Sequence, residues 1–267
     1  MDIIQAIILG AIQGLTEFIP ISSSAHLVIL PWLFHWKTPG LLFDVSLHLG
    51  TLIALLAFFW REWYNTAKAS ISERKGKLPA GRSFFVPLIF ACVPAGIAGI
   101  SFEGAVEHIF RNPACIGTAM IGLGIILFIA DRYGRKQRSI DSITIRDWII
   151  IGLAQAFAII PGVSRSGITI TAGLFCGLQR ETAAKFSFLI GAPIIFGAAV
   201  YELRKIFEHG LPGDQVVPFI TGVLTAAIVG YLCIGFLLAY LKKRSAVIFV
   251  AYRVVFGIGV IAMYLLR

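Results

Sequence analysis

Long apolar runs separated by short polar segments make up the hydropathy pattern of this chain. The runs are unbroken, whereas the strands of a membrane β-barrel would alternate apolar and polar side chains. Apolar runs of about 20 residues predict helices that cross a bilayer, so we expect an all-α integral membrane protein. The six strongest candidate spans are residues 43–60, 84–101, 114–131, 183–201, 216–241 and 246–266.

Two further apolar regions, residues 1–35 and 147–178, are too short and too interrupted to be ordinary spans. Pro20 interrupts the first region, and a Pro-Gly pair at 161–162 interrupts the second. Proline removes a backbone donor and ends or kinks a helix. We therefore predict that each region is a re-entrant helical hairpin, with two short helices that enter and leave the membrane on the same side.

Composition supports a membrane protein. The chain has 267 residues, of which 58% are hydrophobic and only 14% charged, with a mean hydropathy of +0.86. These values exclude an ordinary soluble domain. The first residues, MDII, lack the basic segment of a cleaved signal peptide, and we expect none. The cysteines lie in apolar runs and are interpreted as core residues, not as disulfides or metal ligands: Cys92, Cys115, Cys176 and Cys233.

Basic residues are concentrated in three loops and explain much of the net charge of +9. Such loops mark the cytoplasmic side of a membrane protein, so the charge requires no nucleic acid partner. The three clusters are Arg61, Lys68, Arg74, Lys75, Lys77 and Arg82; Arg132, Arg135, Lys136, Arg138 and Arg146; and Lys242, Lys243 and Arg244.

Three matches between the two halves of the chain predict an internal duplication. The segment GAIQGLTEFIPISSSA (10–25) aligns with GLAQAFAIIPGVSRSG (152–167). This alignment pairs Gly10 with Gly152, Gln13 with Gln155, Ser22 with Ser164 and Ser24 with Ser166. Two weaker matches follow in the same order, 45–53 with 186–194 and 86–99 with 217–230. Self-similarity at a constant order along the chain predicts two structural repeats.

The predicted repeats are residues 1–132 and 147–267, joined by a basic linker at 133–146. Each repeat holds one hairpin and three spans. Because three is odd, the second repeat lies inverted in the membrane, and both termini lie outside. The two hairpins then approach the midplane from opposite faces. Broken helices that meet at mid-membrane are a known way to build a polar site in lipid.

Charged side chains inside the membrane segments indicate where this site lies. They are Glu17, Arg165 and Arg253, with Asp44 nearer an edge. Charges inside a bilayer are costly and usually functional. Gln13 is four residues before Glu17, so the two side chains lie on one face of a helix.

The first hairpin adds hydroxyls and a histidine. Ser22 or Ser23 can cap the helix after Pro20, and His26 falls on the face that carries these hydroxyls. Ser23 with His26 provides a candidate nucleophile and base. Glu17 has the wrong sign to bind phosphate, but it suits a bridging divalent cation or a proton.

The second hairpin carries PGVSRSGIT, with Arg165 at the predicted start of a helix. A helix N-terminus presents free N–H groups, and a guanidinium grips phosphate with two hydrogen bonds. Two such helix ends with Arg165 predict an anion site. The hydroxyls available to it are Ser22, Ser24, Ser164, Ser166 and Thr169.

Structural explanations remain open beside these roles. Each of the same hydroxyls also suits helix packing. We interpret His48 as a core histidine with satisfied hydrogen bonds. Arg253 also suits an interhelical lock for Glu17, and Glu17 with Arg165 suits an ion pair between the hairpins.

The segments QGLTEFIPISSSAHL and PGVSRSGIT together resemble the two motifs of the undecaprenyl pyrophosphate phosphatases of the bacitracin-resistance type. The resemblance covers essentially the whole chain. It implies an enzyme of the bacterial inner membrane, reached from the periplasmic side, that hydrolyses C55 prenyl pyrophosphate to the monophosphate and phosphate. The reaction recycles the lipid carrier of cell-wall synthesis. The resemblance also implies a divalent cation, Mg²⁺ or Ca²⁺.

By this resemblance, the catalytic residues are Glu17, Ser23, His26 and Arg165, the metal ligands are Gln13 and Glu17, and the substrate-binding residues are Ser22, Ser24, Ser164, Ser166, Thr169 and Arg253. Two departures from the motif occur. Gln13 stands where many members have Glu, so a site with two carboxylates is in doubt. Ser24-Ala25 stands where Thr-Gly is common.

The expected mechanism is attack of Ser23 on the terminal phosphorus, with its proton taken by His26 or Glu17. Direct attack by water, with Ser23 only a ligand, stays open. A transporter or flippase for an anionic lipid is the main alternative, since inverted repeats are typical of transporters. A non-catalytic membrane scaffold would leave Glu17 and Arg165 unexplained. A homodimer is also left open.

Overall fold

The computed structural model describes residues 1–36, 40–71, 84–209 and 213–267. Within these ranges the chain is helical, with one isolated β-bridge between Arg138 and Leu178. The helices of the first half are α1 (Ile3–Phe18), α2 (Ser23–Leu33), α3 (Leu41–Phe58), α4 (Trp60–Ile71), α5 (Phe85–Ser101), α6 (Glu103–Ala105), the π-helix η2 (Val106–Phe110) and α7 (Pro113–Tyr133). Those of the second half are the 3₁₀ helix η3 (Ile140–Ser142), α8 (Ile145–Gln155), the 3₁₀ helix η4 (Ala156–Ile159), α9 (Arg165–Phe175), α10 (Arg180–His209), α11 (Gly213–Lys243) and α12 (Val247–Leu266).

The prediction of an all-helical membrane protein is confirmed. Four described helices are long and apolar enough to cross a bilayer: α7, the Arg180–Tyr201 part of α10, most of α11, and α12. A fifth candidate is the pair α3 and α4, which is bent by 67° at its break. The predicted span 84–101 coincides with α5, an apolar helix of 17 residues. Six spans were predicted, and the described chain supports four or five.

The break after α3 was not predicted. Residues 61–83 were expected to form a loop, but the chain stays helical through α4. Trp63 of α4 packs against Phe84, which anchors this polar helix to the body of the protein. The remainder of the predicted loop, with its basic residues Arg74, Lys75, Lys77 and Arg82, lies outside the described residues, as does Lys37.

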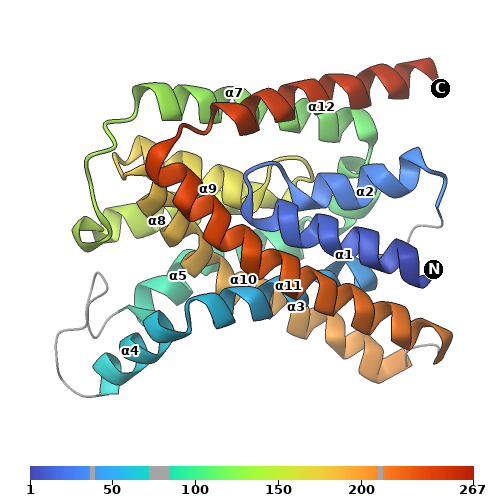
Figure 1. The fold of residues 1–267 in the computed structure, drawn as a ribbon, viewed down its shortest axis with the longest axis horizontal. Coiled ribbons are helices and arrows are strands. Elements are labelled where there is room, and N and C mark those ends of the chain that lie inside the picture. The colour runs from blue at the N-terminus through green and yellow to red at the C-terminus, as the bar shows by residue number, and fades with distance from the viewer. Residues whose placement is uncertain (37–39, 72–83, 210–212) are drawn as a thin grey trace.

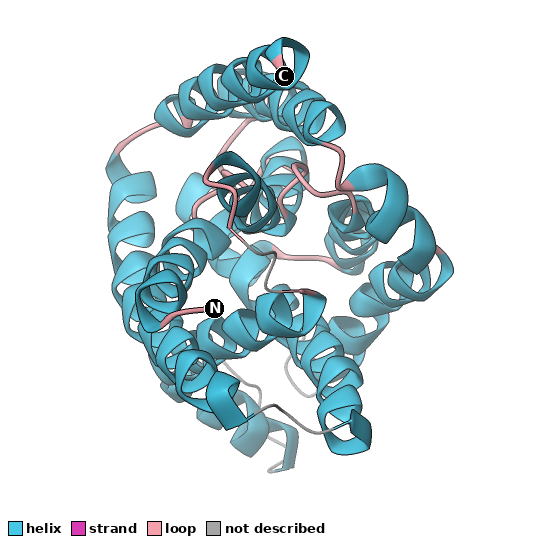
Figure 2. Cartoon of the chain, turned by 90° about the vertical axis from the view of Figure 1, so that its right-hand side faces the viewer, coloured by secondary structure: helices cyan, strands magenta, loops and turns pink. Residues whose placement is uncertain are grey.

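The two predicted hairpins lie towards opposite ends of the molecule. Figure 1 shows α1 and α2 near the end that carries both chain termini, and α8 and α9 towards the other end. Seen from the terminal end, helices surround the non-helical segments that lie near the middle of the protein (Figure 2). Each hairpin thus brings its turn into the interior, where water is excluded and polar groups require partners.

Each hairpin packs closely against a helix of the other half. In α1, a Cβ on Gly10 would lie 2.5 Å from the carbonyl oxygen of Gly222 in α11. In α8, a Cβ on Gly152 would lie 2.7 Å from the carbonyl oxygen of Ala91 in α5. Both contacts are backbone approaches that only glycine permits, which is how small residues join membrane helices. The hairpins are therefore fixed by helices that come from the other half of the sequence.

Candidate active site

The two hairpin turns share one backbone conformation. Ser22 precedes α2 with φ 75° and ψ 92°, and Ser164 precedes α9 with φ 71° and ψ 116°. A positive φ is strained for a residue with a side chain, and such strain clusters at functional sites. Each serine caps its helix, because its Oγ accepts a hydrogen bond from the amide N of Ala25 or Gly167.

Hydroxyl pairs repeat at the two turns. The Oγ atoms of Ser22 and Ser24 lie 3.2 Å apart, and those of Ser164 and Ser166 also lie 3.2 Å apart. The sequence alignment had paired these serines, so the shared geometry agrees with it. All of these hydroxyls but the half-buried Ser24 are buried.

Hydrogen bonds connect one turn to the other. The amide of Gly162 donates to the Oγ of Ser22 at 3.1 Å, and the Oγ of Ser166 donates to the carbonyl of Ile19 at 3.4 Å. The two hairpin turns, which are about 140 residues apart in the sequence, therefore meet in the structure as predicted. The predicted hydroxyls Ser22 and Ser166 act here as connectors between the turns.

Arg253 of α12 is hydrogen-bonded to both hairpin turns. Its side chain is fully buried and donates to the carbonyl of Pro20 at 3.0 Å and to that of Gly162 at 2.7 Å. Further bonds reach the carbonyls of Met120 and Val163. It was predicted to bind substrate or to lock Glu17, but the structure shows it bonded to backbone carbonyls of both turns. A guanidinium, with five donors, suits this role.

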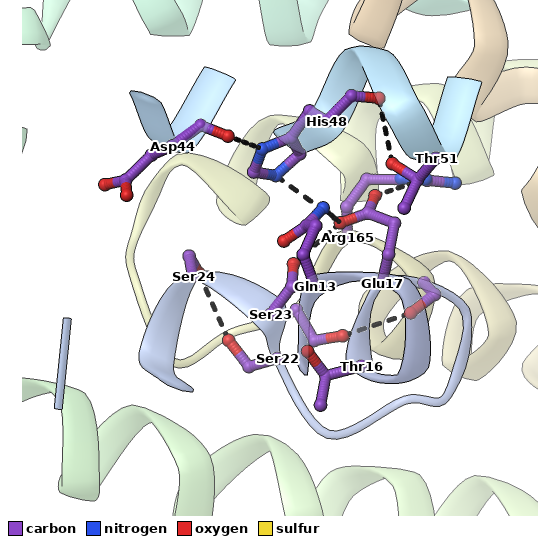
Figure 3. A network of polar contacts seen from close by, with 12 residues as sticks. Gln13, Thr16, Glu17, Ser22, Ser23, Ser24, Asp44, His48, Thr51 and Arg165 are labelled. Atoms are coloured by element: carbon purple, nitrogen blue, oxygen red, sulfur yellow. Dashed lines mark hydrogen bonds and ion pairs between the residues drawn. The ribbon is translucent and has the colours of Figure 1, made fainter. Parts of the chain in front are cut away.

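Glu17, at the end of α1, is the centre of the polar cluster (Figure 3). Its Oε2 accepts hydrogen bonds from Gln13 Nε2 at 3.0 Å and from Ser23 Oγ at 2.6 Å. Its Oε1 accepts from Arg165 Nη2 at 2.7 Å, across the two hairpins. The structure thus brings together four of the predicted site residues. The Glu17–Arg165 ion pair that stood as a structural alternative is present.

Arg165 is held on its other side as well. Its Nη1 donates to the carbonyl of Ser187 at 3.0 Å, while its Nε is buried without a partner. A Cβ at position 191 would lie 1.9 Å from Nη1, so Gly191 is needed to admit the guanidinium. Thr169, predicted to bind substrate, bonds the carbonyl of Arg165 and the Oγ of Ser187. Thr169 thus links the backbone of Arg165 to Ser187, whose carbonyl binds the guanidinium.

His26 is not hydrogen-bonded to Ser23. Its Nδ1 lies 2.7 Å from the carbonyl oxygen of Ser22, and its Nε2 lies 2.7 Å from the hydroxyl of Tyr252. Because a carbonyl only accepts, Nδ1 carries the proton, and Nε2 accepts from the tyrosine. The ring also stacks on Phe256 at 4.7 Å. Tyr252 had no signal in the sequence, since it is one aromatic residue in an apolar span.

His48 is a residue of this cluster that the sequence reasoning missed. Its Nε2 lies 3.4 Å from Glu17 Oε2, and its Nδ1 lies 2.7 Å from the carbonyl oxygen of Asp44. The Asp44 carboxylate itself pairs with Arg111 at 2.9 Å. His48 had been interpreted as an ordinary core histidine. The sequence does not show which side of α3 faces Glu17, because this depends on how the helix is rotated about its axis.

The donors near Glu17 suit a hard divalent cation. Gln13 Oε1 is buried without a hydrogen-bond partner, although Nε2 of the same amide binds Glu17. Carboxylate, amide and hydroxyl oxygens are the ligands that Mg²⁺ and Ca²⁺ prefer. No group of three His, Cys, Asp or Glu residues is placed for a metal within the described ranges. A cation here would therefore depend on one carboxylate with neutral donors.

Comparison with known proteins identifies the family of this chain. The family described as bacitracin resistance protein BacA matches residues 6–259. The chain belongs to this family. Undecaprenyl-diphosphatase of Moorella thermoacetica is 49% identical over 267 residues, which is 100% of both chains. Undecaprenyl-diphosphatase of Pelotomaculum thermopropionicum is 51% identical over 263 residues, 98% of this chain and 97% of the relative. The family predicted from the two motifs is thereby confirmed.

Proposed function

We propose that this membrane protein is an undecaprenyl-diphosphatase, which hydrolyses the C55 prenyl diphosphate to the monophosphate and phosphate. The observation that carries the proposal is the short contact between Ser23 Oγ and Glu17 Oε2, 2.6 Å, beside the guanidinium of Arg165. A hydroxyl nucleophile, a carboxylate that accepts its proton and a phosphate-binding guanidinium are a suitable set of groups for phosphoryl transfer. Full-length similarity to proteins of this name supports it.

Ser23 attacks the terminal phosphorus in this proposal. As its Oγ–P bond forms, its proton passes to Glu17 Oε2, and the bond from phosphorus to the prenyl monophosphate breaks. Glu17 passes this proton to the departing prenyl monophosphate. Water then attacks the phosphoserine, Glu17 takes a proton from the water and returns it to Ser23 Oγ as the Oγ–P bond breaks, and hydrogen phosphate leaves. Direct attack by water on the substrate is the alternative. The hydrogen bond of Ser23 to Glu17 favours Ser23, because a base already lies within reach of its proton.

Arg165 binds the phosphates. One N–H on each terminal nitrogen is used, by Glu17 and by Ser187, and the second N–H on each would bind the phosphates. A fixed guanidinium needs no reorganisation when charge develops on the transferring group. The turns beside it present the hydroxyls of Ser24 and Ser164, together with the N-terminus of α9. A divalent cation held by Glu17 and Gln13 would neutralise phosphate charge.

His26 and Glu17 were the two predicted bases for Ser23. We infer that Glu17, not His26, takes the proton of Ser23, since both imidazole nitrogens are bonded elsewhere. The ring holds the carbonyl of Ser22, and so the strained turn before Ser23. His26 is then a positioning residue for the nucleophile.

The inverted repeat also belongs to the proposal. Matching turns at Ser22 and Ser164, matching glycine contacts, and hairpins at opposite ends of the molecule support it. The repeats would be 1–132 and 147–267, in the inner membrane, with both termini outside. A single Cys at Asp2 in a Cys-free variant should react with an impermeant maleimide in intact cells, and one at Arg135 only after permeabilisation. Labelling of position 135 in intact cells would contradict this orientation.

Hydrolysis is tested by phosphate release from prenyl diphosphate by the protein in detergent, with and without chelator. We expect release that stops when the chelator is present. A transporter or flippase, the rival function, would release no phosphate, because it moves its substrate without breaking the phosphoanhydride bond. Absence of release from protein that unfolds cooperatively would therefore contradict the enzyme and favour transport.

A further inference from the structure

His48 presents an unused lone pair to the carboxylate of Glu17. Its Nδ1 lies 2.7 Å from the carbonyl oxygen of Asp44, which accepts and cannot donate, so Nδ1 carries the proton. In the neutral ring Nε2 is then a bare acceptor. It lies 3.4 Å from Glu17 Oε2, which is also an acceptor. Figure 3 shows the ring between Asp44 and the Glu17 cluster.

Arg165 pairs with the other carboxylate oxygen, Oε1, while Gln13 and Ser23 donate to Oε2. None of these groups lies between Oε2 and the His48 lone pair, and two acceptors that face each other attract only through a positive group between them. A proton on Nε2 would satisfy them, but a hydrogen bond between imidazolium and carboxylate is normally about 2.7–2.9 Å long. The observed 3.4 Å is longer. Two ligands of one cation, at right angles on bonds of roughly 2.1–2.4 Å, lie about 3.0–3.4 Å apart. The spacing therefore suits a shared metal ion better than a shared proton.

The amide of Gln13 adds a third acceptor. Its Oε1 is buried without a partner, and its Nε2 is bonded to the same Glu17 Oε2. A proton on His48 would leave this oxygen unsatisfied, at a cost of about 1–3 kcal/mol for a buried acceptor. A flip of this amide, which exchanges its oxygen and nitrogen, would turn the oxygen towards Glu17 Oε2. One cation could then take nitrogen from His48 and oxygens from Glu17 and Gln13.

The backbone contact of His48 fits this role. Histidines that bind metal almost always donate their other N–H to a carbonyl or carboxylate, which fixes the tautomer and the ring. The Asp44 carbonyl does this here, while the Asp44 carboxylate is occupied by Arg111.

We propose that His48 is a metal ligand through Nε2, and that the cation site at Glu17 is a mixed nitrogen and oxygen site. This inference rests on the cation of the proposed function. Imidazole suits Fe, Ni, Cu and Zn ions best, and Mn²⁺ is the first and weakest binder of that series, whereas Ca²⁺ takes oxygen ligands alone. The site should therefore prefer Mn²⁺ to Ca²⁺.

The test is pulsed electron paramagnetic resonance of the purified protein with bound Mn²⁺ and no substrate, which detects a coordinated imidazole through its ¹⁴N coupling. Wild type and the matched control His35→Gln should show this coupling, because His35 is exposed and lies outside the cluster. His48→Gln should lose it. Its Mn²⁺ affinity should fall at least about 10–100-fold, the loss seen when even an outer partner of a ligand is removed.

Three results would overturn the inference: ¹⁴N coupling that persists in His48→Gln, Mn²⁺ bound to wild type without that coupling, or no Mn²⁺ binding by folded wild type. Phosphate release from prenyl diphosphate is measured on the same samples. Hydrolysis that continues in chelator would contradict His48 as a catalytic metal ligand while the enzyme stands. Coupling to His48 in a protein without hydrolysis would contradict the enzyme while the site stands.

Discussion

The two hairpin turns have the same backbone and opposite chemistry. Ser22 and Ser164 share a positive φ, a cap to the third following amide, and a hydroxyl pair 3.2 Å wide. The next residue differs: it is Ser23 in one turn and Arg165 in the other. One turn thus presents a nucleophile beside a carboxylate, and the other presents a cation.

The helices that lead into the turns differ in the same way. Gln13 and Gln155 occupy equivalent positions and are both buried, but the residue four positions later is Glu17 in α1 and Ile159 in η4. Neither turn alone has both a base and a phosphate-binding group. The comparison teaches that one backbone conformation occurs at two helix starts, and that the residues around it differ so that the base lies at one turn and the cation at the other.

The largest expected effect is at the nucleophile. Ser23→Ala removes the attacking oxygen while it leaves Arg165 in place. Removal of a nucleophilic serine elsewhere has cost about 10⁶ in turnover, and we expect a loss of at least ~10⁴ in kcat. Phosphate release and substrate binding by the detergent-solubilised protein measure it. Ser24→Ala, which changes the neighbouring hydroxyl, should lose far less. Activity near wild type in Ser23→Ala would establish direct attack by water.

Arg165→Lys tests the other turn. The ammonium keeps the charge but loses the planar fork that binds Glu17 and the Ser187 carbonyl together. Loss of one preorganised donor typically costs about 10²–10³ in kcat, and we expect a loss of that size. Steady-state phosphate release measures it, and thermal unfolding verifies the fold. Turnover close to wild type would mean that Arg165 serves only to join the hairpins.

The contribution of the Glu17–Arg165 ion pair to the fold can be measured without measuring catalysis, through the free energy of unfolding. Glu17→Met and Arg165→Met each leave one buried charge without its partner, which typically costs about 3–5 kcal/mol of unfolding free energy. The double variant removes both charges and should recover most of that loss. Equilibrium unfolding in detergent measures all three proteins. Single variants as stable as wild type would show that the contact does not contribute to the fold.

The starts of the hairpins also differ. Both carry a capping box, at Asp2 with Gln5 and at Thr144 with Asp147. Asp147 also accepts two hydrogen bonds from Arg138, at 2.8 and 2.7 Å. Hydrogen bonds to charged groups contribute about 1.5–3 kcal/mol, so Asp147→Asn should lose about 2 kcal/mol of stability and Asp2→Asn less. An equal loss in both variants would contradict this difference.

Low pH should remove the stabilisation that the Asp147 carboxylate provides. Burial raises the pKa of Asp147, but hydrogen bonds from Arg138 and Thr144 outweigh it and hold the pKa below its ordinary value. A lowered carboxylate pKa contributes stability above the unfolded value, about pH 4, and loses it as pH falls through the folded value. The gap between wild type and Asp147→Asn in thermal unfolding should therefore narrow below about pH 4. A gap that is constant with pH would contradict the role of the charge.

The sequence predicted the parts of the site that its motifs contain. Gln13, Glu17, Ser23 and Arg165 converge as expected, because intramembrane charges and polar hairpins have few ways to be satisfied in lipid. The partners of Arg253 and the position of His48 were not predictable. They depend on how α12 and α3 are rotated about their axes, and in helices apolar on all sides the sequence pattern does not fix that rotation. The helix α4 was missed because its contact with Phe84 is tertiary.

The smallest expected effect concerns Tyr252, which is hydrogen-bonded to His26 beside the first turn. Ser22 O accepts from the His26 ring at 2.7 Å and from the His26 amide at 3.4 Å, whereas Ser164 O accepts from the Ile168 amide at 2.9 Å. The imidazole thus supplements a long backbone hydrogen bond, and the Tyr252 hydroxyl donates to its Nε2. Tyr252→Phe keeps the ring stack and removes this single hydrogen bond, which contributes about 0.5–1.5 kcal/mol. We expect kcat to fall by at most about tenfold, with the pH profile of phosphate release unchanged, because His26 positions the turn and takes no proton. Ile168→Val at the other turn is the matched control and should leave kcat near wild type. A change in the pH profile of Tyr252→Phe would return His26 to the role of catalytic base, and the two turns would then differ in proton transfer as well as in charge.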